Sequence, residues 1–383
     1  MTNCDLFMRV KIYVFLLGVS FYFPCSGQEK FVLEVTTDNN KVQTLDLQEA
    51  MAPAYYPNEL TYESKATGTD STFLFNGSIE ESYYCDLLID SARFSGSFVL
   101  YPGKNVLKIL NVEGEMKIIR KDDHVKDNLF SLYSSWFTHD SYIRGFLEDN
   151  KKLIRSEKLR GSESLTTADV IRDSLLKSSY RGTDTALYLY SSDYPDSYNA
   201  LWKIAHLMMF GYETLHGKSF EKLNDDLKNS YLGKHLDSLI EKYERVAVGK
   251  TIPNAHFENE KGEKVFLYDF LDSQNLILID FWYHNCGPCL AQFPKVKELY
   301  TANRDKGFQV VGVSTDKAED RQKWIQRIDE QGLNWVNVID VEGFSSSEYG
   351  VNLFPFNFLV NNKGKILKVN ISNVELYKIL KDT

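Results

Sequence analysis

One segment decides the fold of the last third of this chain: Asp280-Phe281-Trp282-Tyr283-His284-Asn285-Cys286-Gly287-Pro288-Cys289. It continues an almost unbroken apolar run that begins at Leu276, which is typical of a strand buried on both faces. From the cysteines to about Asn303 the pattern instead predicts a helix. The cysteine pair therefore lies where a buried strand gives way to a helix.

The spacing of Cys286 and Cys289 favours redox chemistry, because two intervening residues allow a small disulfide ring. At the start of a helix, unpaired N–H groups and the positive end of the helix dipole favour a thiolate, so we expect a lowered pKa for Cys286. Pro288 is tolerated there because its missing N–H would be unpaired in any case. We predict that Cys286 is the exposed nucleophile and that Cys289 resolves the mixed disulfide.

Asp280 is the third candidate catalytic residue. It lies six residues before Cys286 in an otherwise apolar strand, where burial should raise its pKa. A carboxyl group of this kind can accept a proton from Cys289 and return it during exchange. The alternative is a structural aspartate at a strand end that accepts backbone hydrogen bonds.

A zinc site is the alternative interpretation of the cysteine pair. Zinc usually takes four ligands, supplied by two such pairs or by one pair and spaced histidines. The sequence contains no second pair, and we expect the side chain of His284 to point away from the cysteines. We therefore expect no metal and no other cofactor.

Alternating strand and helix signals predict an α/β domain over residues 246–383. A second buried strand is expected at Phe308–Ser314 and an amphipathic helix at Asp320–Gln331. Two further strands flank the turn Asn361-Asn362-Lys363-Gly364, and a short helix is expected over Val374–Leu380.

The preceding residues divide into two regions. Residues 28–120 are expected to form a β-rich domain, with a turn at Asn76-Gly77 and a buried Cys85 in one strand. Residues 121–245 are expected to form a helical connecting region, in which Asp196 caps a helix over Ser197–Met209. Neither region contains a recognisable nucleophile–base pair.

Residues 1–27 have the pattern of a signal peptide: a short basic stretch, an apolar run and small residues before the expected cleavage site. This predicts export to the periplasm or cell envelope. An uncleaved anchor, or lipidation at Cys25, would instead tether the protein to the membrane. The net charge of −9 and the lack of a basic cluster argue against a nucleic-acid partner.

The active-site segment, together with Pro294, the stretch Tyr349–Pro355 and the lead-in Ala247–Pro253, resembles TlpA/ResA-like periplasmic thiol-disulfide oxidoreductases of the thioredoxin superfamily. The resemblance implies a thioredoxin fold, a mixed central sheet flanked by helices, preceded by an extra N-terminal domain. It also implies a cis peptide bond at Pro355 and substrate contacts from five residues: Trp282, Gly287, Pro288, Phe354 and Pro355.

Three departures from the family pattern concern the site, and one of them is Phe356, which follows Pro355 where threonine is usual. Asn285 replaces the usual tryptophan before the first cysteine, so the rim should be more polar. Gln292 stands where ResA-like reductases typically carry a glutamate, whereas Asp280 fits the thioredoxin pattern. We therefore expect the acid that serves the resolving cysteine to lie on the strand and not on the helix.

The resemblance implies an enzyme that reduces protein disulfides in the envelope, with a membrane thiol-transfer protein as electron donor and a route toward cytochrome c maturation. Two other classes stay open. One is a thiol peroxidase of the peroxiredoxin type, and the other is an envelope binding module in which redox chemistry is secondary.

Overall fold

A computed structural model describes residues 29–382 except for 40–41, 52, 58–60, 63, 69–70, 90–92, 113–114, 138–166, 210, 272–274 and 352. The predicted signal peptide lies outside the described residues. Among the helices that the model describes, none is both long and apolar enough to cross a bilayer.

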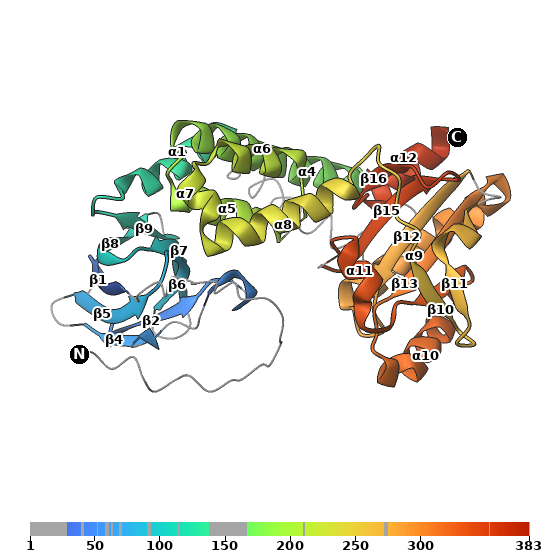
Figure 1. The fold of residues 1–383 in the computed structure, drawn as a ribbon, viewed down its shortest axis with the longest axis horizontal. Coiled ribbons are helices and arrows are strands. Elements are labelled where there is room, and N and C mark those ends of the chain that lie inside the picture. Colours follow the sequence, from blue (N-terminus) through green and yellow to red (C-terminus); the bar gives the residue numbers. More distant parts are fainter. Residues whose placement is uncertain are drawn as a thin grey trace, which may run out of the picture.

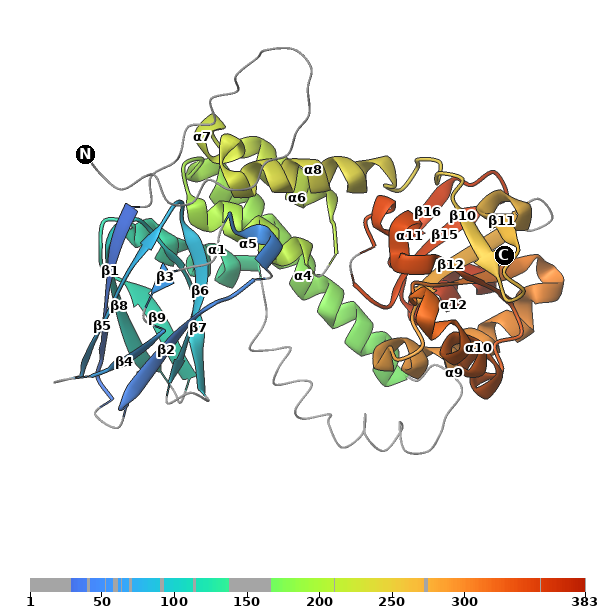
Figure 2. The same ribbon diagram turned by 60° about the horizontal axis from the view of Figure 1, so that its bottom comes forward.

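Two antiparallel-rich sheets form the β-rich region, and they pack face to face (Figure 2). The first is ordered β3 (Thr61–Tyr62), β5 (Thr72–Ile79), β1 (Glu29–Thr37), β8 (Gly103–Val112) and β9 (Glu115–Arg120). The second is ordered β4 (Lys65–Thr67), β2 (Thr44–Glu49), β6 (Tyr83–Ile89) and β7 (Arg93–Leu100). Alternate residues of β1, namely Phe31, Leu33 and Val35, point into the core, as expected for a half-buried strand.

One expected turn in this region is wrong. Asn76 and Gly77 lie inside β5 and pair with Val32 and Phe31 of β1. Pairing with β1 along the whole of β5 therefore overrides the local turn preference of the Asn-Gly dipeptide. The expectation for Cys85 is confirmed, since it is fully buried in β6.

Six helices follow among the described residues: α1 (Leu129–Phe137), α4 (Thr167–Asp193), α5 (Tyr198–Met208), α6 (Thr214–Lys222), α7 (Asp225–Asn229) and α8 (Tyr231–Arg245). They share one apolar core with the β-rich region, where Trp202 of α5 donates its Nε1–H to the carbonyl of Ser82 at 3.2 Å. The predicted cap of α5 is wrong by one residue. Ser197 accepts the N–H of Ala200, while Asp196 pairs with Lys126.

The C-terminal domain contains a seven-stranded mixed sheet. Its order is β11 (Lys264–Phe266), β10 (His256–Asn259), β14 (Val336–Ile339), β13 (Phe308–Ser314), β12 (Leu276–Trp282), β15 (Phe356–Asn361) and β16 (Ile366–Val369). The central strands β12, β13 and β14 run parallel, and β15 runs antiparallel to β12. This arrangement confirms the expected thioredoxin fold, and all seven residues of β12 are buried.

Helices cover this sheet on both faces (Figure 1). They are α9 (Gly287–Asn303), α10 (Arg321–Gln331), α11 (Phe344–Glu348) and α12 (Asn373–Asp382), so the last helix is longer than expected. Short 3-10 turns occupy Pro53–Tyr55, Val125–Asn128, Leu267–Phe270, Arg304–Lys306, Ala318–Asp320 and Val341–Gly343. One apolar core contains Phe293 and Trp324, and the other contains Ile252 and Tyr349.

Several contacts join the described parts of the helical region to the C-terminal domain. Lys177 of α4 pairs with Glu375 of α12 at 2.5 Å. The linker after α8 runs beside β16, where Gly249 donates to the carbonyl of Ile366 and Lys250 accepts from the N–H of Ile366, each at 2.8 Å. The ring of Tyr243 also lies against Gly350 in the loop that leads to Pro355.

We expect Gly350→Ala to destabilise the protein by about 2 kcal/mol or more, since a β-carbon would lie 2.8 Å from Tyr243 and the backbone has a φ of +71°. Gly332→Ala is the matched control, because its φ is +58° and its β-carbon would meet nothing within 4 Å. Urea unfolding of both variants measures the difference. Equal losses would show that Tyr243 does not constrain this loop.

Candidate active site

The junction of β12 and α9 places both cysteines as the sequence predicts. Cys286 is the N-cap of α9, and its sulfur accepts the N–H of Cys289 at 3.2 Å. The two cysteines form a disulfide in this structure. Pro288 lies in the first turn of α9 and Pro294 lies inside the helix. The sulfur of Cys286 is therefore held where unpaired N–H groups can stabilise a thiolate.

The expectation of an exposed Cys286 is wrong for this disulfide form, because only 1% of the residue is accessible. Tyr283 and Phe354 pack against the apolar core that contains both cysteines, with their ring centroids 5.3 Å apart. Gly287 and Pro288, by contrast, are exposed. The sulfur of Cys286 thus lies just beneath the surface, beside the accessible backbone of Gly287 and Pro288.

Asp280 is buried in the centre of β12, with 1% of the residue exposed. Burial raises the pKa of its carboxyl group to about 7, while a hydrogen bond from Gln292 opposes the shift. Gln292 Nε2 lies 3.3 and 3.4 Å from the two carboxylate oxygens. Because Gln292 follows Cys289 by three residues on α9, the carboxyl group lies under the same first turns of the helix.

Gln292→Ala should move the pH dependence of Asp280 upward. Gln292 donates the hydrogen bond that favours the ionised carboxylate and lowers the pKa of Asp280. Without it, nothing offsets the rise in pKa that burial causes. A hydrogen bond of about 1 kcal/mol corresponds to a shift of roughly 0.7 pH units. The measurement is the pH midpoint of mixed-disulfide release, with Lys306→Ala, at an exposed position, as the control variant. An unchanged or lowered midpoint would contradict the assignment.

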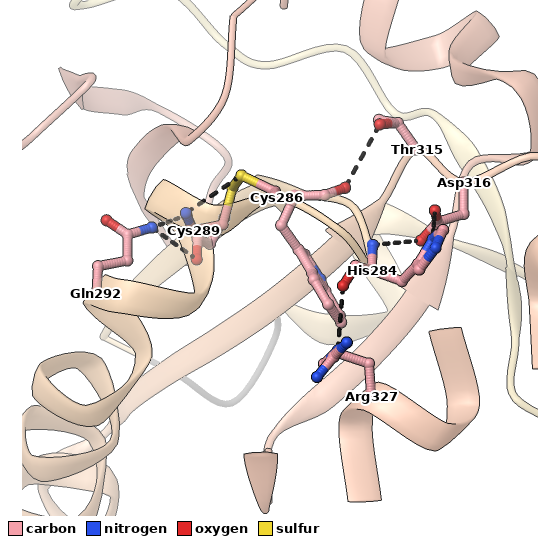
Figure 3. The surroundings of a disulfide bond; sticks show 9 residues. His284, Cys286, Cys289, Gln292, Thr315, Asp316 and Arg327 are labelled. Carbon is pink, nitrogen blue, oxygen red and sulfur yellow. Dashed lines mark hydrogen bonds and ion pairs between the residues drawn. A yellow bond between two sulfur atoms is a disulfide. The ribbon is translucent and has the colours of Figure 1, made fainter. Parts of the chain in front are cut away.

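His284 makes contacts that the sequence does not predict. Its Nδ1–H donates to Asp316 Oδ1 at 2.5 Å, and its backbone N–H donates to Asp316 Oδ2 at 2.8 Å. Figure 3 shows the imidazole directed toward Asp316 and away from the disulfide, as the sequence led us to expect. Asp316 lies two residues beyond β13, the parallel neighbour of β12. Because parallel neighbouring strands end at the same edge of the sheet, the positions of His284 and Asp316 just after β12 and β13 could have revealed this contact.

Three side chains near this point have ligand atoms within 4.8 Å of one another: His284, Asp316 and Asp320. Protein donors already occupy these carboxylates. Asp316 accepts from His284 and Ser314, and Asp320 pairs with Lys323 at 2.6 Å. The arrangement is that of a hydrogen-bonded network within the protein.

The predicted cis peptide bond is confirmed between Phe354 and Pro355, and both residues are half-buried. Four of the five predicted substrate contacts, Gly287, Pro288, Phe354 and Pro355, are thus at least partly accessible. The fifth, Trp282, offers no accessible surface for such a contact in this disulfide form. Its side chain is fully buried and packs edge-on against Phe293, with ring centroids 5.2 Å apart.

Residues 248–369 match the model of the AhpC/TSA family. The thiol-disulfide oxidoreductase ResA of Bacillus thuringiensis is 28% identical over 127 residues, which make up 33% of this chain and 71% of that protein. ResA of Bacillus subtilis is 27% identical over 126 residues, 33% of this chain and 68% of that protein. The solved thioredoxin domain of a thiol-disulfide oxidoreductase from Bacteroides vulgatus is 31% identical, with a TM-score of 0.33, and the match covers 36% of this chain and 96% of that one. Residues 248–369 are thus similar to the thioredoxin-fold domain of ResA-like thiol-disulfide oxidoreductases.

This ResA-like chain has two further features. The curated relatives named above match only about a third of it, 33% in each case. In addition, the buried acid of its site is on β12, and the helix residue Gln292 hydrogen-bonds to that acid.

Proposed function

We propose that this protein reduces disulfide bonds of proteins in the cell envelope through Cys286 and Cys289. The observation that carries the proposal is the position of the cysteine pair at the start of α9, over a buried carboxyl group with a pKa of about 7. Such a group changes protonation state at the pH where the exchange takes place. We also propose Cys286, Cys289 and Asp280 as the catalytic residues.

The first half of the reaction forms a mixed disulfide. The thiolate of Cys286 attacks one sulfur of the substrate disulfide, a Cys286–substrate bond forms, and the other substrate sulfur leaves as a thiolate that takes a proton from solvent. The N–H of Cys289, which reaches the sulfur of Cys286 at 3.2 Å in the disulfide form, helps to hold that sulfur as an anion.

The second half releases the substrate. The Asp280 carboxylate takes the proton of the Cys289 thiol, and the resulting thiolate attacks the sulfur of Cys286. The second substrate sulfur leaves and is protonated, so the substrate has gained two electrons and two protons. The enzyme is left with the Cys286–Cys289 disulfide, the form seen in this structure.

A second dithiol must restore the enzyme by the same exchange in reverse. We propose a membrane thiol-transfer protein for this step, because the predicted signal peptide places the chain outside the reducing cytoplasm. Gly287 and Pro288 between the cysteines favour a reducing potential, near the value of about −270 mV for thioredoxin and far from about −120 mV for DsbA. Supply of reduced cysteines for cytochrome c maturation is the route that we propose for these electrons.

Trapping in cells tests this function. A Cys289→Ala chain should accumulate mixed disulfides between Cys286 and its substrates, and dithiothreitol should release them for identification. The matched control carries Cys286→Ala as well and should trap nothing. Absence of captured proteins, or a measured potential above about −150 mV, would reject the reductase assignment.

A further inference from the structure

The short segment that leads to Cys286 is held by backbone hydrogen bonds at both of its ends. It consists of Tyr283, His284 and Asn285, between β12 and α9. The carbonyl of Trp282, just before it, accepts the N–H of Thr315 at 2.9 Å. The N–H of Cys286, just after it, donates to the carbonyl of Tyr283 at 3.0 Å. Its middle residue, His284, makes the remaining contacts.

Asp316 is the buried centre of these contacts, with 5% of the residue exposed. One carboxylate oxygen accepts from the imidazole of His284, and the other accepts from the backbone of His284 and from Ser314 Oγ at 2.6 Å. A carboxylate that accepts three hydrogen bonds in a buried position fixes its partners more firmly than one in solvent. It therefore ties His284 to the end of β13.

Arg327 contacts His284 on the side opposite Asp316. Its Nε–H donates to the carbonyl of His284 at 3.1 Å, and the side chain comes from α10. Figure 3 shows Asp316 and Arg327 on two sides of His284, with the disulfide at a distance from the imidazole. The N–H, the carbonyl and the side chain of His284 are thus each engaged, two residues before Cys286.

We infer that His284 and Asp316 are positioning residues that hold Cys286 at the N-cap of α9, and thereby set the reactivity of its thiolate. The inference rests on the proposed function. The helix can stabilise an anionic sulfur only while that sulfur stays within reach of the first N–H groups. A loosened segment would let the sulfur leave this position, and its ionisation would become harder.

The test uses the full chain with His284→Ala and measures the pH dependence of Cys286 alkylation by iodoacetamide, read by mass spectrometry. We expect the pKa of Cys286 to rise by about one unit, toward about 8.5 for a free thiol. The equilibrium with glutathione should move toward the disulfide by up to about tenfold, a limit reached at pH values above the pKa of Cys286 in both chains, because the anionic reduced form loses stabilisation. His256→Ala, at an exposed histidine of β10, is the control and should change neither value.

His284→Asn provides the decisive comparison, because its side-chain amide N–H can take the place of imidazole Nδ1–H toward Asp316. It should restore more than half of the change caused by His284→Ala. Native values in a folded His284→Ala chain would overturn the inference. So would an Asn variant identical to the Ala variant, since the imidazole itself would then matter.

Arg327→Ala keeps the inference testable if His284→Ala does not fold. It removes the donor to the His284 carbonyl from a partly exposed helix position, and a smaller change in the same direction is expected. No change in the folded chain would count against the inference. Failure of the proposed function can be distinguished from failure of this inference. If the proposed function is wrong, the unaltered chain itself will show no Cys286 thiolate at neutral pH and no disulfide exchange.

Discussion

A chain that carries Cys286→Ser is expected to lose disulfide reductase activity by more than about 10³-fold, measured as reduction of insulin by dithiothreitol. A hydroxyl group is not ionised at neutral pH, so the substrate disulfide would meet no nucleophile. Losses of this size follow removal of the nucleophile in other covalent enzymes. The cysteine at position 289 is not expected to replace it, because it lies inside α9 and not at the N-cap.

Cys85→Ala is the matched control for this experiment. Cys85 lies fully buried in β6 of the β-rich region, and burial raises the pKa of its thiol well above the usual value. Its removal should therefore leave the rate of insulin reduction unchanged. Peroxide consumption at the native rate by a Cys289→Ala chain would favour the thiol peroxidase alternative and contradict the exchange mechanism.

Asp280→Asn is expected to slow release of the mixed disulfide by about 10²- to 10⁴-fold, the usual contribution of a general base. In the native chain the pKa of Asp280 is about 7, so the carboxylate that we propose as the acceptor of the Cys289 proton is present mainly above that pH. The release rate should therefore rise as pH increases through about 7, and the variant should lack this rise. Stopped-flow release from a preformed mixed disulfide measures both. A variant with the native rate and pH profile would eliminate Asp280 as the base.

The same substitution should have the opposite effect on stability. The folded chain holds the Asp280 proton to a pH of about 7, whereas the ordinary value is 3.8. Stability is therefore lost as pH rises from about 4 through about 7, because a buried carboxylate must form. Above pH 7, Asp280→Asn should gain up to about 4 kcal/mol over the native chain, from about three pKa units. Urea unfolding of the disulfide forms at pH 4 and pH 8 measures this, and an equal difference at both values would contradict it.

The local sequence pattern was sufficient to predict an element where that element is determined by its own residues. The apolar run of β12 and the cysteine spacing predicted the strand, the helix start and the burial of Asp280. Local pattern failed where a distant partner decides. Asn76-Gly77 extends β5 because β1 pairs along its whole length, and Ser197 instead of Asp196 caps α5 because Asp196 pairs with Lys126.

The surroundings of the cysteines likewise include contacts that depend on distant residues and that local pattern did not predict. Asp316 and Arg327 contact His284 from positions 32 and 43 residues further along the chain, so no spacing rule in one sequence connects them. Phe354 likewise packs against Tyr283 and the core that contains Cys286, although it lies far along the chain from both. These contacts require the order and direction of the strands, which motifs alone do not supply.

The segment that follows α8 also covers the outer edge of β16. β16 is the last strand of its sheet, and an unpaired outer strand offers a template on which another polypeptide can add. Lys250 and Gly249 satisfy the N–H and carbonyl of Ile366, and Ile252 donates to the carbonyl of Gly364. A shortened chain that begins after Ile252 would leave these groups open to self-association. The first residues of the C-terminal domain thus cover an edge of its own sheet.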